Sequence, residues 1–127
     1  MDKPPPIAAV SIALIRGERV LLVRRGRAPA KGLFAFPGGR VEAGETLEEA
    51  VRRELREETA LEAGPVALVV TLDIAPESPG PGFRLHVFQA DHVGGEPQPG
   101  DDADLADFYS LEEMQHLPVI TSVTRVA

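Results

Sequence analysis

The chain has 127 residues, of which 13 are basic and 20 acidic, giving a formal net charge of −7. This length is typical of one domain, so we expect residues 1–127 to form a single domain. The acidic balance disfavours binding to long nucleic acids or anionic membranes, which relies on neutralising phosphates. Residues 1–31 nevertheless carry seven basic and two acidic side chains, whereas residues 62–127 carry two basic and eleven acidic ones.

The chain contains no cysteine, which excludes disulfides and thiolate chemistry and favours a reducing compartment. Its longest apolar run, residues 7–15, is far shorter than the roughly 20 residues of a membrane helix. Its first residues also lack the basic and then apolar pattern of a signal peptide. We therefore expect a cytoplasmic protein.

The first forty residues predict three short strands. Residues 7–15 and 20–23 are rich in aliphatic and β-branched side chains and read as a buried hairpin, joined by residues 16–19. Residues 33–36 are a third strand candidate. The Pro-Gly-Gly sequence that follows at 37–39 is typical of a turn.

A helix is predicted over residues 46–58. Thr46 and Glu49 match the capping-box pattern that begins many helices. The helical period gathers apolar side chains on one stripe and charged ones on the opposite side. The spacing also predicts two i,i+4 ion pairs, Glu48 with Arg52 and Glu49 with Arg53. The apolar stripe comprises Leu47, Ala50, Val51 and Leu55, and the charged side comprises Glu48, Glu49, Arg52 and Arg56.

The second half of the chain predicts further strands at 66–72 and 83–90, with a weak final strand at 107–110. Loops rich in Pro, Gly and acidic residues are expected at 76–82 and 94–103. Ser110 and Glu113 are spaced as a second capping box, which predicts a short last helix. This order of elements predicts a mixed sheet covered by helices, in the α/β or α+β class.

Three carboxylates occupy an unusual position on the predicted helix. Glu54, Glu57 and Glu58 fall within an arc that overlaps the apolar stripe near the end of the helix. Unpaired carboxylates resist desolvation, and acids at a helix C-terminus oppose the macrodipole, so a cation is expected beside them. Oxygen ligands of this kind suit Mg²⁺ or Mn²⁺. The alternative is a solvated helix end where the three glutamates only repel one another.

These residues continue a longer pattern that resembles the Nudix hydrolases, whose signature is G-x5-E-x7-R-E-U-x-E-E-x-G-U, with U aliphatic. Eight of the nine specified positions match over residues 39–61, and the exception is Ala60, where the motif has glycine. That glycine closes the helix, so the alanine is expected to strain the turn without removing a ligand. The matching residues are Gly39, Glu45, Arg53, Glu54, Leu55, Glu57, Glu58 and Leu61.

The resemblance implies an α/β/α sandwich and hydrolysis of a nucleoside diphosphate linked to another group. It implies that Glu54, Glu57 and Glu58 bind magnesium, with the Gly38 carbonyl assisting, and that either Glu57 or Glu54 is the general base. It further implies that Arg53 and Glu45 orient these carboxylates. Relatives are frequently dimers, so a homodimer is also expected.

A further acid in a later loop often completes such sites in the family, three residues before the aromatic pair of the last strand. That position is Leu105 here, and Asp101, Asp102 and Asp104 lie close by in sequence. They are candidates for the extra acid, or else a solvated acidic turn.

Substrate contacts are expected from the basic segment that leads into the Pro-Gly-Gly sequence. The candidate phosphate clamps are Arg24, Arg25, Arg27 and Lys31, with a solvated surface as the alternative reading for any one of them. Gly39 is a candidate for close backbone contact. Four aromatic residues are candidates for stacking on the base of a nucleotide, although aromatic residues of this kind are more typical of a core. They are Phe34, Phe83, Phe88 and Tyr109.

Three functions remain open from the sequence. The first is a Mg²⁺-dependent pyrophosphohydrolase acting on a small nucleotide, with ADP-ribose-like substrates ahead of ordinary or oxidised nucleoside triphosphates. The second is a sensor with this fold that binds nucleotides without cutting them, and the third is a plain divalent-cation-binding domain. The complete set of carboxylates disfavours the sensor, and the Gly-Gly sequence with Arg53 disfavours the third.

Overall fold

A computed structural model describes residues 4–27, 30–76 and 79–120 of the chain. Its first two strands, β1 (Ile7–Arg16) and β2 (Arg19–Arg25), form the predicted antiparallel hairpin, with Ile15 opposite Val20. The turn includes Gly17 with φ of 61°, a left-handed conformation that glycine adopts without a steric penalty.

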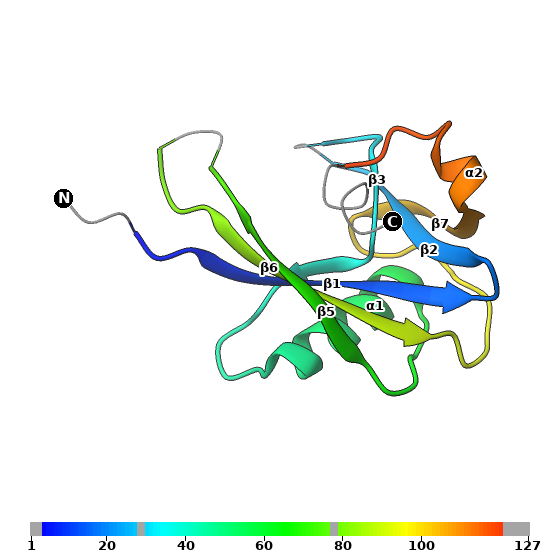
Figure 1. Ribbon diagram of the computed structural model, residues 1–127, viewed down its shortest axis with the longest axis horizontal. Helices are drawn as coiled ribbons and strands as arrows, with labels where there is room; N and C mark the ends of the chain where they lie inside the picture. The colour runs from blue at the N-terminus through cyan, green and yellow to red at the C-terminus, as the bar shows by residue number, and fades with distance from the viewer. Residues whose placement is uncertain (1–3, 28–29, 77–78, 121–127) are drawn as a thin grey trace.

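Beyond this turn the two strands diverge, and each takes different partners (Figure 1). β1 pairs in parallel with β6 (Phe83–Asp91) along most of its length, and β5 (Ala67–Ile74) lies antiparallel at the outer edge of β6. β4 (Gly38–Arg40) pairs with the first half of β1. β2 pairs with β3 (Phe34–Ala35) and with β7 (Ala103–Ser110), completing a mixed sheet of seven strands.

Apolar side chains from both faces of the sheet form two main cores, beside a small cluster of Val23, Ala103 and Ala106. On one face, α1 (Leu47–Thr59) packs Ala50, Val51 and Leu55 against residues of β1, β2 and β6. On the other face, Met114 of the short α2 (Leu111–Met114) joins the core around Leu22 of β2. Figure 1 shows α1 behind β5 and β6, with α2 set apart from it beside β7. The predicted mixed sheet with helices packed on it is confirmed, and it belongs to the α/β class.

Two local predictions are wrong. The Pro-Gly-Gly sequence is not simply a turn, because Gly38 and Gly39 lie in β4, opposite Ser11 and Val10 of β1. A Cβ on Gly38 would lie 2.1 Å from the Val10 carbonyl oxygen, so this approach to β1 requires glycine. The last strand also starts at Ala103, inside the predicted loop 94–103, because residues 103–110 pair with β2.

The other predicted elements are present, with bounds that differ from the predicted ones. The strands expected at 66–72 and 83–90 are β5 and β6, and the third strand candidate shortens to β3. Of the loop predicted at 76–82, residues 77 and 78 lie outside the described residues. Within the described ranges, no helix combines the length and apolarity needed to cross a membrane.

Candidate active site

The helix that carries the predicted metal ligands has a defined start and end. At its start Thr46 accepts a hydrogen bond from the Glu49 N–H at 3.1 Å, and the Glu49 carboxylate accepts one from the Thr46 N–H at 2.9 Å. This confirms the capping box. At its end Ala60 adopts a left-handed conformation with φ of 63° and donates its N–H to the Arg56 carbonyl. Alanine therefore occupies the backbone conformation that glycine usually takes at a helix end.

Glu58 is a carboxyl buried at the end of α1, where only 8% of the residue is exposed. Its Oε1 accepts a hydrogen bond of 2.9 Å from the Gly38 N–H in β4. Burial is the main cause that raises the pKa of Glu58 to about 8, and the charges of Glu54 and Asp101 raise it further, while the Gly38 N–H acts to lower it. Glu58 therefore retains its proton near neutral pH when no cation is nearby.

Glu54 lies one turn earlier in α1 and packs directly under β4. Its side chain is 13% exposed, and a Cβ on Gly39 would lie 2.6 Å from its carboxylate. Burial raises the pKa of Glu54, partly offset by the hydrogen bond and charge of Arg53. Glu54 and Glu58 also interact through a hydrogen bond that raises the pKa of Glu58. Gly38 and Gly39 thus let β4 lie close to the carboxyl groups of Glu54 and Glu58, which are largely removed from water.

Arg53 joins the acids of this region in one network. Its Nε donates to Glu45 Oε2 at 2.7 Å and its Nη2 donates to Glu45 Oε1 at 3.0 Å, a fork that fixes the guanidinium. Its Nη1 donates to Glu54 at 2.8 Å and to Glu57 at 3.2 Å, and its Nη2 also donates to the Arg40 carbonyl. The hydrogen bonds from Arg53 lower the pKa of Glu45. Arg53 and Glu45 are therefore brought together, and Glu54 is held on the same guanidinium.

The expectation that all three glutamates point inward is wrong for Glu57. Its side chain is 44% exposed and contacts Arg53, whereas Glu54 and Glu58 are turned toward β4. Within residues 4–27, 30–76 and 79–120, no three acidic or histidine side chains stand in a ready ligand arrangement. The expected Glu49–Arg53 pair is also replaced, because Glu49 caps the helix and Arg53 binds Glu45, while the Glu48–Arg52 pair forms at 3.2 Å.

A later loop meets the end of α1. The Gln98 N–H donates to the Thr59 carbonyl at 2.8 Å, and the Gly100 N–H donates to the Glu58 carbonyl at 3.0 Å. The next residue, Asp101, has φ of 53° and lies near enough to Glu58 for its charge to affect the pKa of that carboxyl. Of the three aspartates named from the sequence, Asp101 is therefore the one whose charge acts on Glu58.

The other two aspartates bind arginines. Asp104 accepts from Arg24 Nε at 2.7 Å, and Asp102 lies 3.1 Å from Arg27 Nη1. Two candidate acids and two candidate phosphate clamps thus neutralise one another. Arg24 and Asp104 do so between β2 and β7, and Arg27 and Asp102 just beyond the ends of these strands. The sequence could not indicate these contacts, because they depend on β2 and β7 being neighbours in the sheet.

The remaining substrate candidates are distributed around the sheet. Phe34 and Phe88 are buried, and the Phe34 and Tyr109 rings meet edge to face at 5.6 Å. Phe83 lies beneath Arg40, with the guanidinium carbon 5.5 Å from the ring centre. Lys31 is exposed.

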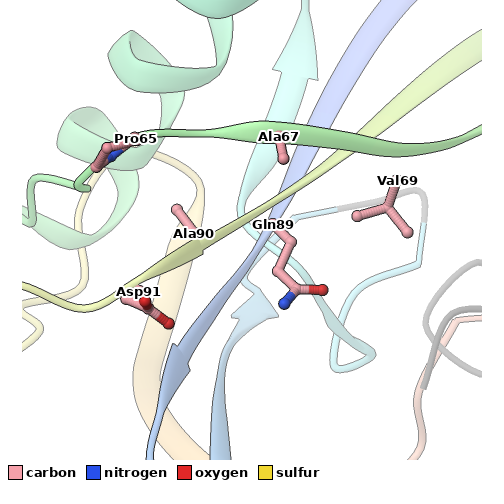
Figure 2. A pocket seen from close by; sticks show the side chains of 6 residues that line it. All are labelled: Pro65, Ala67, Val69, Gln89, Ala90 and Asp91. Atoms are coloured by element: carbon pink, nitrogen blue, oxygen red, sulfur yellow. The ribbon is translucent and has the colours of Figure 1, made fainter.

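A shallow pocket of about 280 Å³ lies elsewhere, on β5 and β6 (Figure 2). Figure 2 shows the Gln89 and Val69 side chains at one end of it and Asp91 at the other. Its lining includes none of the carboxylates described above, so the chemistry of the glutamate group lies outside this pocket. The lining residues are Pro65, Ala67, Val69, Gln89, Ala90 and Asp91.

Comparisons with known proteins agree with this geometry. The NUDIX domain family matches residues 5–125. The chain is 42% identical over 116 residues to an ADP-ribose pyrophosphatase of Methanocaldococcus jannaschii, covering 88% of this chain and 66% of that protein. It therefore spans just under two thirds of the length of this curated relative.

Solved structures show the same fold. A MutT NUDIX hydrolase from Burkholderia pseudomallei superposes with a TM-score of 0.86 at 28% identity, covering 98% of this chain and 95% of the other. The NUDIX domain of Shewanella oneidensis NrtR, solved with ADP-ribose, superposes with a TM-score of 0.83 at 21% identity, covering 95% and 83%. The signature at residues 39–61, the sheet and the family match agree, and the chain belongs to the NUDIX domain family.

Proposed function

We propose that this chain is a Mg²⁺-dependent pyrophosphohydrolase that cleaves a nucleoside diphosphate linked to another group, with an ADP-ribose-like substrate favoured. One observation carries the proposal. Glu54 and Glu58 lie together under two glycines of β4, and burial raises the pKa of both carboxyls. A protein that only needed a stable helix end would replace such a pair with apolar side chains at little cost.

The residues fit a hard divalent cation. Glu54 and Glu58 supply carboxylate oxygens, which Mg²⁺ prefers, and a cation would replace the proton that Glu58 now retains. Glu57 is exposed and becomes a third ligand if its side chain turns away from Arg53. The Gly38 carbonyl is the fourth candidate. A bound cation of this kind neutralises diphosphate charge and lowers the pKa of a coordinated water.

The other residues of the group position these carboxylates. Arg53, fixed by the fork to Glu45, holds Glu54 through its Nη1 at 2.8 Å. Glu57 is the better placed of the two candidate general bases, because it is 44% exposed while Glu54 is 13% exposed and bound to Arg53. We assign proton abstraction from the attacking water to Glu57.

Phosphate contacts are assigned to the basic segment at the end of β2. Arg27 is 74% exposed and its bond to Asp102 is a solvent-exposed ion pair, which contributes little stability and exchanges readily for a phosphate. Lys31 is exposed on the same connection, and Arg25 stands at the end of β2. Gly39 lets the backbone of β4 lie close to the Glu54 carboxylate, and we assign this stretch of backbone to close contact with the substrate.

Similarity to two known proteins favours an ADP-ribose-like substrate. The Methanocaldococcus jannaschii relative is named an ADP-ribose pyrophosphatase, and the Shewanella oneidensis domain was solved with ADP-ribose. Hydrolysis of the diphosphate bond in ADP-ribose yields AMP and ribose 5-phosphate, with one water consumed.

The test is a nucleotide screen with Mg²⁺ or Mn²⁺, with products separated by chromatography. ADP-ribose is expected to turn over faster than ordinary or oxidised nucleoside triphosphates. Glu57→Gln should lower kcat at least about a hundredfold, since general base catalysis contributes that much or more. Glu112→Gln, at an exposed position of α2, is the matched control and should leave kcat unchanged.

Three results would count against the proposal. Binding of nucleotides without turnover would indicate a sensor. Faster turnover of nucleoside triphosphates than of ADP-ribose would make the triphosphates the favoured substrate class. Equal kcat in Glu57→Gln and Glu112→Gln would remove the assigned base.

A further inference from the structure

Residues 98–102 form a segment seated on the last turn of α1. Two of its N–H groups, from Gln98 and Gly100, donate to the Thr59 and Glu58 carbonyls. Carbonyls in the last turn of a helix have no partner within the helix, so these bonds satisfy groups that would otherwise face solvent or remain unpaired. The segment therefore contacts the backbone of the same residue whose carboxyl lies under β4.

Gly100 is the point of closest approach. A Cβ at this position would lie 2.7 Å from the Glu57 carbonyl oxygen, a distance that real Cβ contacts do not reach. Gly100 is not one of the glycines with a positive φ, so its backbone conformation is open to any residue. Glycine is required here because of the close contact with α1 and not because of the backbone conformation.

The far end of the segment is hydrogen-bonded to Gly26, the residue that follows β2. The Gly26 N–H donates to the Asp102 carbonyl at 2.7 Å, and the Ala103 N–H donates back to the Gly100 carbonyl at 3.0 Å. A Cβ on Gly26 would lie 3.1 Å from the same Asp102 carbonyl oxygen. The exposed pair of Arg27 and Asp102 adds little stability to these backbone bonds. Asp101 is thus held from both sides, between α1 and β2.

We propose that residues 98–102 position the carboxylates at the end of α1, and that Gly100 is the positioning residue that allows this segment to seat. It fixes the last turn, which carries Glu57 and Glu58, relative to β4. This inference rests on the proposed function for its kinetic readout. Its structural readout is independent of that function.

The test variant is Gly100→Ala, which adds only the Cβ that meets the Glu57 carbonyl. Amide hydrogen exchange at residues 98 and 100 should become at least about tenfold faster, because both N–H groups lose their acceptors. The Kd for Mn²⁺ should rise about tenfold, the range for residues that orient metal ligands. The kcat for the nucleotide substrate should fall about tenfold with KM changed less than about twofold.

Controls separate positioning from general destabilisation. Gly64→Ala is matched, because Gly64 also lacks a positive φ and its added Cβ would come closest to the end of the Val93 side chain, at 3.3 Å, with the Asp91 carbonyl oxygen at 4.0 Å. It should leave exchange, Kd and kcat unchanged. If Gly100→Ala does not fold, Gln98→Pro removes one of the two N–H donors and places a ring carbon against the Thr59 carbonyl, so this end of the segment should lift from α1. The Kd for Mn²⁺ and the kcat should then change in the same directions, and exchange should become faster at residue 100.

Unchanged exchange, Kd and kcat in Gly100→Ala would overturn the inference. Absence of turnover in the wild-type chain, with the exchange and Kd changes intact, would count only against the proposed function.

Discussion

The Gly38 N–H donates a hydrogen bond of 2.9 Å to Oε1 of Glu58, joining the first residue of β4 to the end of α1. This N–H acts against the burial that raises the pKa of Glu58 to about 8. A strand and the helix that follows it in the chain thus meet at a carboxyl that is protonated at neutral pH in the absence of a cation. The behaviour of Glu58 with pH and with metal follows from this contact.

The stability of the metal-free protein should fall as pH rises from about 5 to 8. Glu58 has an ordinary pKa of about 4.3 in the unfolded chain and a pKa of about 8 in the folded one. Between these values the folded state holds a proton that the unfolded state releases, so the free energy of unfolding decreases with pH. A pKa difference above one unit corresponds to more than about 1.4 kcal/mol, or a fall in Tm of several degrees.

Thermal unfolding in chelator across this pH range checks the prediction. Glu58→Gln stays neutral at every pH and should flatten the fall in Tm, whereas Glu112→Gln should keep it. A fall of the same size in Glu58→Gln would assign the pH dependence to another group.

Arg53→Lys should lower kcat about 10- to 100-fold, as expected for a residue that orients metal ligands. A lysine ammonium cannot reproduce the fork to Glu45 while also holding Glu54 and the Arg40 carbonyl. Arg52→Lys is the matched control, because Arg52 makes comparable bonds to the Ala63 and Gly64 carbonyls away from the glutamate group. Steady-state kinetics with thermal unfolding should give a loss of stability in both and a loss of kcat in Arg53→Lys alone. Equal kcat in the two variants would remove the orienting role.

Ala60→Gly should stabilise the protein by about 1 kcal/mol, since a residue with a Cβ in the left-handed conformation is strained by about that amount. The corresponding rise in Tm is about 3–5 °C. Ala43→Gly is the control: Ala43 lies in the turn before α1 without positive φ, so glycine there should not stabilise. Differential scanning calorimetry measures both, and a lower Tm in Ala60→Gly would mean that the alanine methyl group contributes packing that outweighs the strain.

The sequence predicted the elements whose signals are local. The capping boxes of Thr46 with Glu49 and Ser110 with Glu113 both form, and the hairpin of β1 and β2 is where its aliphatic runs indicated. The left-handed conformation of Ala60 also follows from the motif glycine that it replaces. Each of these depends on residues within a few positions of one another.

The features that the sequence did not predict depend on distant partners. Gly38 and Gly39 form a strand because β1 is available beside them, which no local pattern indicates. A helical wheel gives directions around the axis, so it placed Glu57 with Glu54 and Glu58, but Arg53 and the position of β4 decide which of them is buried. The choice among the three aspartates is decided in the same way, by the pairing of β2 with β7.

The most direct test of a cation site at Glu54 and Glu58 is calorimetric titration of the metal-free protein with Mn²⁺ at pH 7 and pH 8. Binding should be tighter at pH 8, because the cation displaces the proton on Glu58. Glu58→Gln should weaken binding at least about tenfold, and Glu112→Gln should leave it unchanged. Equal Mn²⁺ affinity in wild type and Glu58→Gln, with no dependence on pH, would contradict the site.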